Sequence, residues 1–238
     1  MSLVQVLIPA AGSGTRFGGA VMKQYLPICG RPVLAHSISA FNFHPAVAGI
    51  TVVLAENDQM FDATVGSLFA DINTVQGGDT RAESVRNGLQ SIKDKHPETE
   101  WVLVHDAARP CLPPDCLDQL LDKGREDQDG ALLAVPVGDT LKRSDEDSCS
   151  VSTEDRRGLW SAQTPQLFPL DALCAAIDTA REAGHHLTDE ASAMEFAGAR
   201  PKLIMGSAAN IKITHPGDLM IAEAWLSRAQ KTRLQRDE

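Results

Sequence analysis

A glycine-rich segment near the start of the chain carries residues suited to phosphate chemistry. Residues 9–16 read PAAGSGTR, and Lys23 follows downstream. Small residues let main-chain N–H groups approach an anion closely, and Arg16 and Lys23 add positive charge. The segment therefore predicts a loop that binds a polyphosphate, lined by Ala10, Ala11, Gly12 and Gly14.

Two common glycine loops do not fit this segment. A P-loop requires G-x-x-x-x-G-K-[ST], which the sequence lacks. A dinucleotide fingerprint requires a third glycine where this chain has Phe17. It also requires an acid about 20 residues later at the end of the second strand, and the acid that ends that strand here, Glu56, comes far too late. The remaining pattern, G-x-G-x-R with a downstream lysine, resembles the nucleotidyltransferase signature. That signature usually has a proline before the lysine; Met22 stands here, which we interpret as a change in loop stiffness.

Four further segments narrow the resemblance. They are residues 77–85 (GGDTRAESV), 102–110 (VLVHDAARP), 188–192 (TDEAS) and 210–214 (NIKIT). With the glycine loop, and in this order, they resemble the 2-C-methyl-D-erythritol 4-phosphate cytidylyltransferase family of the non-mevalonate isoprenoid pathway over nearly the whole chain. One departure is Ala209, where the family often has an acid.

The resemblance implies that a substrate phosphate oxygen attacks the α-phosphorus of CTP and that pyrophosphate leaves. Because both reactants are anions, catalysis is mainly positioning and charge neutralisation. We expect Arg16 and Lys23 to stabilise the charge that develops. Asp106, just past a predicted strand, is expected to bind substrate and Mg²⁺, which prefers oxygen ligands. The resemblance assigns recognition of cytosine and ribose to Gly78, Asp79 and Ser84.

The acceptor, a polyol phosphate, needs cations of its own. The resemblance assigns this role to Lys212 and to Arg156, and in the family the arginine reaches the substrate from the partner's arm. Arg157 is adjacent, but Asp155 and Gly158 set a register that favours Arg156. Further substrate contacts are implied for Arg109, Thr140, Thr164 and Thr188. Two alternatives stay open: Arg109 could instead pair with an acid, and Thr188 could cap a helix.

The elements that must position these residues alternate between strands and helices. Apolar runs predict strands over residues 3–8, 50–55, 101–104 and 131–137. Apolar residues at helical spacing predict a helix after Pro32, after the capping-box sequence TRAE at 80–83, after residues 113–114 and from Leu170 onward. A last helix is predicted over 222–238. We expect 210–214 to end the last strand region.

This alternation predicts an α/β fold built from right-handed βαβ units. We expect a three-layer, mostly parallel Rossmann-like nucleotidyltransferase sheet, with ligands at the carboxyl ends of its strands. Residues 139–158 are polar and predict a protruding β-arm. We expect residues 1–238 to form a single cytidylyltransferase domain that assembles as a homodimer, with arm exchange completing each site across the interface.

Bulk properties restrict the class of protein. The 238 residues are 43% hydrophobic, with a formal net charge of −10. We predict no nucleic-acid partner because no basic excess exists, and no membrane partner because no apolar run is long enough to span a bilayer. The start has no secretory pattern, and five cysteines without a C-x-x-C pair predict reduced thiols in a cytoplasmic protein.

Three other functions stay open at this stage. A ribitol-5-phosphate cytidylyltransferase would share fold and chemistry and differ only in the acceptor. A UTP-dependent sugar-1-phosphate uridylyltransferase uses a similar first loop. A non-catalytic nucleotide-binding regulator would not require Arg16, Lys23, Asp106 and Lys212 together.

Overall fold

A seven-stranded sheet forms the centre of the protein in the computed structural model, which describes residues 3–12 and 22–234. The strand order is β11-β7-β10-β6-β1-β4-β5, and β10 is antiparallel to both of its neighbours while the other pairs are parallel. The strands are β1 (Val4–Pro9), β4 (Val47–Leu54), β5 (Ile72–Gln76), β6 (Trp101–Val104), β7 (Ala131–Pro136), β10 (Trp160–Pro169) and β11 (Lys202–Met205).

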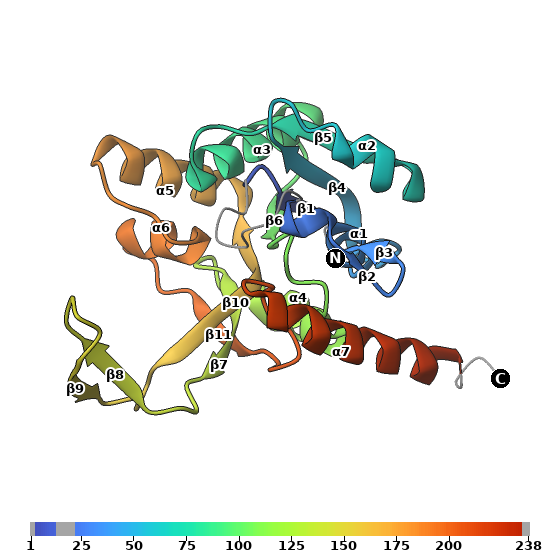
Figure 1. The fold of residues 1–238 in the computed structure, drawn as a ribbon. Coiled ribbons are helices and arrows are strands. Elements are labelled where there is room, and N and C mark those ends of the chain that lie inside the picture. The colour runs from blue at the N-terminus through green and yellow to red at the C-terminus, as the bar shows by residue number, and fades with distance from the viewer. Residues whose placement is uncertain (1–2, 13–21, 235–238) are drawn as a thin grey trace.

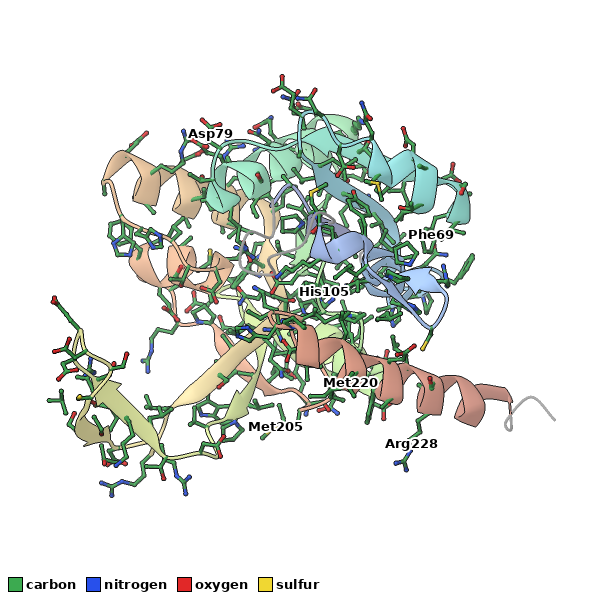
Figure 2. The ribbon with its side chains drawn as sticks, viewed as in Figure 1. Phe69, Asp79, His105, Met205, Met220 and Arg228 are labelled. Carbon is green, nitrogen blue, oxygen red and sulfur yellow. The ribbon has the colours of Figure 1, made fainter. Side chains whose placement is uncertain are left out.

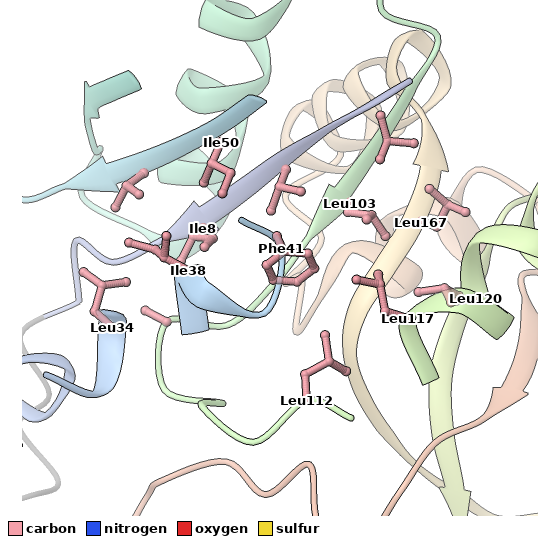
Figure 3. Close-up of a cluster of buried hydrophobic side chains, with 14 of the residues drawn as sticks. Ile8, Leu34, Ile38, Phe41, Ile50, Leu103, Leu112, Leu117, Leu120 and Leu167 are labelled. Atoms are coloured by element: carbon pink, nitrogen blue, oxygen red, sulfur yellow. The ribbon is translucent and has the colours of Figure 1, made fainter. Parts of the chain in front are cut away.

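Helices cover both faces of this sheet, which confirms the predicted three-layer α/β architecture (Figure 1). One face packs on α1 (Val33–Ser39), α2 (Met60–Thr64) and α4 (Pro114–Gly124), and the other on α3 (Arg81–Lys95), α5 (Leu170–Glu182) and α6 (Glu190–Phe196). Alternate strand residues supply the two cores: Ile8 faces the first layer and Leu7 the second. Figure 3 shows the first core around Phe41 and Leu117.

Helix α3 illustrates how local sequence fixes an element beside the cavity described below. Thr80 and Glu83 form the predicted capping box, in which each side chain bonds the other residue's main-chain N–H. Val85, Leu89 and Ile92 are fully buried against the sheet. Gly88 lets the helix approach closely, since a Cβ there would lie 2.8 Å from a methyl carbon of Val53.

A third, smaller hydrophobic cluster lies beneath the last helix, α7 (Pro216–Leu234). Its members come from three distant parts of the chain: Ile28, Val33, Ala108, Cys111, Ile213 and Ala222. Short elements beside it are η2 (Lys23–Tyr25), β2 (Pro27–Ile28) and β3 (Arg31–Pro32), while η3 (Gly66–Leu68) follows α2. The cluster therefore holds segments of the start, middle and end of the chain together.

The predicted arm is a hairpin of β8 (Leu141–Ser144) and β9 (Ser150–Glu154). Its turn is ordered by Asp145, whose carboxylate accepts hydrogen bonds from the main-chain N–H groups of Asp147 and Cys149. The hairpin projects away from the sheet, at the lower left of Figure 1, and none of its strand residues is buried.

Two sequence predictions about element ends were wrong, and the open alternative that Thr188 caps a helix is not what the structure shows. The last strand ends at Met205, and residues 210–214 form no strand. The N-cap of α6 is Asp189 rather than Thr188, because the Asp189 carboxylate accepts the N–H of Ser192. The final helix begins at Pro216, six positions before the predicted start at residue 222.

All five cysteines are free thiols. Within residues 3–12 and 22–234, every helix is too short or too polar to cross a bilayer.

Candidate active site

A cavity of about 330 Å³ opens where β1, β5 and β6 end. Each of these parallel strands is followed by a segment that lines it, so the cavity occupies the carboxyl edge of the sheet where α/β proteins bind ligands. The lining residues are Pro9, Ala10, Ala11, Gly12, Lys23, Gln24, Gly78, Asp79, Thr80, Arg81, Ser84, Asp106, Ala107, Ala108, Lys212 and Thr214.

The first wall is the beginning of the glycine loop. The buried amide of Gln24 donates from Nε2 to the carbonyl oxygens of Ala10 (2.9 Å) and Gly12 (3.3 Å), which fixes the direction of the main chain there. Apart from its chain neighbours, no atom of the described residues lies within 4 Å of the place where a Cβ of Gly12 would stand, and Gly12 lines the cavity. Gly14 and Arg16 lie outside the described residues.

The second wall joins β5 to α3. The Ser84 hydroxyl accepts the N–H of Gly78 at 3.1 Å, and Gly77 donates to the carbonyl of Leu54. A Cβ on Gly77 would lie 2.6 Å from that of Ala11, so glycine allows the two walls to touch. The predicted nucleotide residues Gly78, Asp79 and Ser84 thus share the cavity with the glycine loop.

Asp106 lies in the third wall, just past β6, and three cations surround its carboxylate. Lys212 Nζ is 2.9 Å from Oδ2, Arg109 Nε is 3.3 Å from Oδ2, and Arg81 Nη2 is 3.6 Å from Oδ1. Burial alone would raise the pKa of Asp106, but these positive charges outweigh burial and hold the pKa well below its usual range. The carboxylate is therefore ionised at neutral pH.

A short hydrogen-bonded chain orients the main chain of Asp106. Its N–H donates to Thr164 Oγ1 at 2.9 Å, and that hydroxyl lies 3.0 Å from His105 Nδ1. His105 Nε2 lies 3.0 Å from the carbonyl oxygen of Arg109, which can only accept, so Nε2 carries the proton and Nδ1 accepts from Thr164. His105 lies in the interior (Figure 2), and burial lowers its pKa to about 4, which keeps this neutral tautomer.

Arg109 is an internal residue rather than part of the cavity lining. Besides Asp106, its guanidinium donates to the carbonyl oxygens of Asn210 at 2.7 Å and Ala162 at 3.4 Å, and 9% of the residue is exposed. Burial lowers its pKa, although the Asp106 carboxylate acts in the opposite direction. In this chain the arginine holds the Asp106 loop to β10, which is the alternative that the sequence left open.

Lys23 and Lys212 reach the cavity from opposite ends of the chain. Lys23 Nζ donates to the carbonyl oxygen of Ile213 at 3.0 Å, and the Ile213 N–H donates to Ala108 at 2.8 Å. These bonds lie above the third hydrophobic cluster and tie both lysine segments to the Asp106 loop.

Besides Arg109, four predicted substrate residues do not line this cavity within one chain. Thr164 is buried behind Asp106, and its hydroxyl serves the interior chain described above. Thr140 and Thr188 are exposed elsewhere. Arg156 is exposed beside the hairpin, where its guanidinium donates to the carbonyl of Gly138.

Sequence reasoning missed Gln24, Arg81 and Glu190. Arg81 lines the cavity and is held by Glu190 through two hydrogen bonds, of 2.7 and 3.0 Å. A signal existed, because Arg81 follows an N-cap threonine, and a cation in the first turn of a helix opposes the helix dipole. Gln24 offered no comparable signal.

A metal ion at this site would depend on Asp106. In the described parts of the chain, no three His, Cys, Asp or Glu side chains gather as a metal site. Mg²⁺ nevertheless commonly binds one or two carboxylates together with substrate phosphates and water. Asp106 fits this donor set, since Lys212 and Arg109 make their closest contacts with Oδ2 and Arg81 approaches Oδ1 only to 3.6 Å.

Comparison with known proteins agrees with this arrangement. A model of the 2-C-methyl-D-erythritol 4-phosphate cytidylyltransferase family matches residues 4–228. Proteins of that name from Haemophilus influenzae and Acidithiobacillus ferrooxidans are 48% and 50% identical over 227 and 232 residues, which is 95% of this chain and 97% and 98% of theirs.

Solved structures give the same result. The crystal structure of a 4-diphosphocytidyl-2C-methyl-D-erythritol synthase is 41% identical, has a TM-score of 0.84, and covers 95% of this chain and 99% of its own. The Francisella tularensis 2-C-methyl-D-erythritol 4-phosphate cytidylyltransferase is 34% identical with a TM-score of 0.79, covering 94% and 100% of the two chains. With this coverage in sequence and in fold, the chain belongs to the 2-C-methyl-D-erythritol 4-phosphate cytidylyltransferase family.

Proposed function

We propose that this protein transfers CMP from CTP to 2-C-methyl-D-erythritol 4-phosphate, giving 4-diphosphocytidyl-2-C-methyl-D-erythritol and pyrophosphate. The observation that carries the proposal is the convergence of Lys23, Asp106 and Lys212 on one cavity bounded by main-chain amides. In the reaction a phosphate oxygen of the acceptor forms a bond to the α-phosphorus, and the bond from that phosphorus to the β-phosphate oxygen breaks.

The cavity suits the charges of this reaction. Lys23 and Lys212 both line it, so an anion bound in the cavity meets the positive charge of both side chains. We assign triphosphate binding to the amides of residues 10–12, and base and ribose binding to Gly78, Asp79 and Ser84. Since the lysines are already held by Ile213 and Asp106, little reorganisation is needed when the substrates bind.

We further propose that Asp106 holds a divalent cation, Mg²⁺, together with the substrate phosphates. When bound, such an ion would neutralise phosphate charge and favour departure of pyrophosphate. Asp106 is suited to this task because its low pKa keeps it ionised and the bonds of Thr164 and Arg109 fix its loop.

The exposed arm leads us to propose a homodimer in which Arg156 reaches the partner's site. The β8–β9 hairpin buries none of its own residues, and Val151 and Leu159 expose 64% and 42% of their surface near its ends. Arg156 and Thr140 flank the hairpin in sequence and are not among the residues that line the cavity of their own chain. Exchange of arms would cover the apolar surface and bring both residues to a second cavity. We place this dimer in the cytoplasm, in keeping with its five free thiols.

A pyrophosphate-release assay tests the activity. The protein is incubated with each of CTP, UTP, ATP and GTP, and with 2-C-methyl-D-erythritol 4-phosphate or ribitol 5-phosphate as acceptor. We expect release only with CTP and the methylerythritol phosphate, and loss of release in Lys23→Ala. Preference for UTP, preference for ribitol 5-phosphate, or nucleotide binding without turnover would each overturn the proposal. A monomer by sedimentation at assay concentrations would contradict the proposed arm exchange.

A further inference from the structure

Of the cations that line the cavity in the described part of the chain, Arg81 is the one that the proposed reaction leaves without a role. It is the first residue of α3, where the helix dipole disfavours positive charge. Its side chain is 36% exposed and lines the cavity beside Asp106. A cation kept in an unfavourable place implies that some other interaction depends on it.

Glu190 fixes the guanidinium of Arg81 from behind. The Glu190 side chain is 2% exposed, does not line the cavity, and accepts two parallel bonds from Arg81, Nη1 to Oε1 at 2.7 Å and Nη2 to Oε2 at 3.0 Å. The start of α6 that carries Glu190 is itself held, because the Ala191 N–H donates to Gln166 Oε1 at 2.8 Å and the Gln166 amide donates to Asp189. This two-bond fork leaves the guanidinium little freedom to rotate.

The two oxygens of Asp106 consequently differ. Lys212 and Arg109 make their closest contacts with Oδ2, at 2.9 and 3.3 Å. Arg81 approaches Oδ1 only to 3.6 Å, beyond hydrogen-bond distance, because Glu190 restrains it. Among the described residues, Oδ1 thus accepts no hydrogen bond from a cation, while the positive charge of Arg81 remains nearby.

We propose that Glu190 is a positioning residue for the reaction: it holds Arg81 back from Asp106, so that Oδ1 stays available to a divalent cation bound with the nucleotide. This inference rests on the proposed function of the same cavity. Without the Glu190 charge, the guanidinium would move toward Asp106, donate to Oδ1 and compete with the cation. Removing Arg81 as well would remove the competitor.

The test measures CTP binding by calorimetry, without acceptor, once with Mn²⁺ and once with EDTA. The ratio of the two dissociation constants gives the contribution of the metal. We expect Glu190→Gln to reduce this ratio on the order of tenfold, as is typical when a residue supporting a metal ligand is changed. In EDTA its affinity for CTP should equal that of the parent. The double variant Arg81→Gln, Glu190→Gln should regain most of the metal contribution.

A matched control exists on the same helix. Arg86 of α3 makes a similar fork with Asp178 of α5, at 2.9 to 3.1 Å, outside the cavity. Asp178→Asn should leave the metal contribution at the parent value. If Glu190→Gln does not fold, Arg81→Lys tests the same geometry, because an ammonium group cannot form the fork and is expected to pair with Asp106.

The outcomes are distinct. A Glu190→Gln protein that behaves like Asp178→Asn, or a double variant no better than the single one, overturns the inference, since a purely structural role predicts additive loss. A parent protein that fails to bind CTP or to release pyrophosphate instead overturns the proposed function.

Discussion

Lys212 and Arg109 both contact Asp106, yet we expect the loss of one to lower the reaction rate and the loss of the other to lower the stability of the fold. The Lys212 side chain is 44% exposed, whereas that of Arg109 is 11% exposed and has two main-chain acceptors in addition to Asp106. We therefore expect Lys212→Met to affect the reaction and Arg109→Met to affect the fold.

The magnitudes follow from these contacts. In Lys212→Met, Asp106 keeps Arg109 and Arg81, and a half-exposed ion pair contributes at most about 1 kcal/mol to the free energy of unfolding. Loss of one preorganised positive charge at the reacting phosphate reduces kcat by a factor on the order of a hundred to a thousand. Arg109→Met leaves a buried carboxylate short of one cation and removes the bonds to the carbonyl oxygens of Asn210, which is buried, and of Ala162, which costs roughly 3 kcal/mol of stability.

Two measurements separate the cases: the free energy of unfolding in urea, and kcat for pyrophosphate release at saturating substrates. Lys212→Met should unfold close to the parent and react far more slowly, while Arg109→Met should unfold at clearly lower urea. Equal destabilisation by both substitutions, or a Lys212→Met protein with the rate of the parent, would refute this division of roles.

Three further predictions concern the framework around the cavity. Thr164→Val removes a hydroxyl that serves two buried groups, and we expect a loss of about 1–3 kcal/mol in urea unfolding, with kcat reduced as well. Gly88→Val places a side chain against Leu7 and Val53 under α3, and overpacking should lower the free energy of unfolding by about 1–3 kcal/mol; an unchanged melting temperature would contradict the close approach. Burial lowers the pKa of His36 below its usual 6.5, so the unfolded chain takes up a proton there before the folded chain does, and stability falls as pH drops below 6.5. Unfolding titrations at several pH values should show a shallower decline for His36→Gln.

The strands that the sequence predicted are those whose side chains are apolar on both faces. β1, β6 and β7 consist mostly of buried apolar residues, so an apolar run is enough to identify them. β10 was missed although it lies in the middle of the sheet. It contains Gln163, Thr164 and Gln166, which are buried but polar, and their hydrogen bonds to distant loops and to α6 compensate for the loss of water.

The residues of the candidate site also divide into those that the sequence predicted and those that it did not. Residues in short sequence motifs, such as Gly78, Asp106 and Lys212, were predicted and do line the cavity. For Arg109 the sequence left open a substrate contact or an ion pair with an acid, and it does not show that the guanidinium turns inward to main-chain carbonyls. Glu190 was missed because its carboxylate binds Arg81, which lies 109 positions earlier in the sequence. Only the fold shows that the first residues of α3 and α6 meet.

The third hydrophobic cluster has a consequence for how the enzyme is made. Ile28, Ala108, Ile213 and Ala222 pack together, and Lys23 bonds to a carbonyl that is synthesised 190 residues later. A ribosome-bound chain whose last helix is still inside the exit tunnel therefore has its glycine loop and Asp106 but cannot yet align them. We expect catalytic competence to arise abruptly once α7 has left the tunnel and docks.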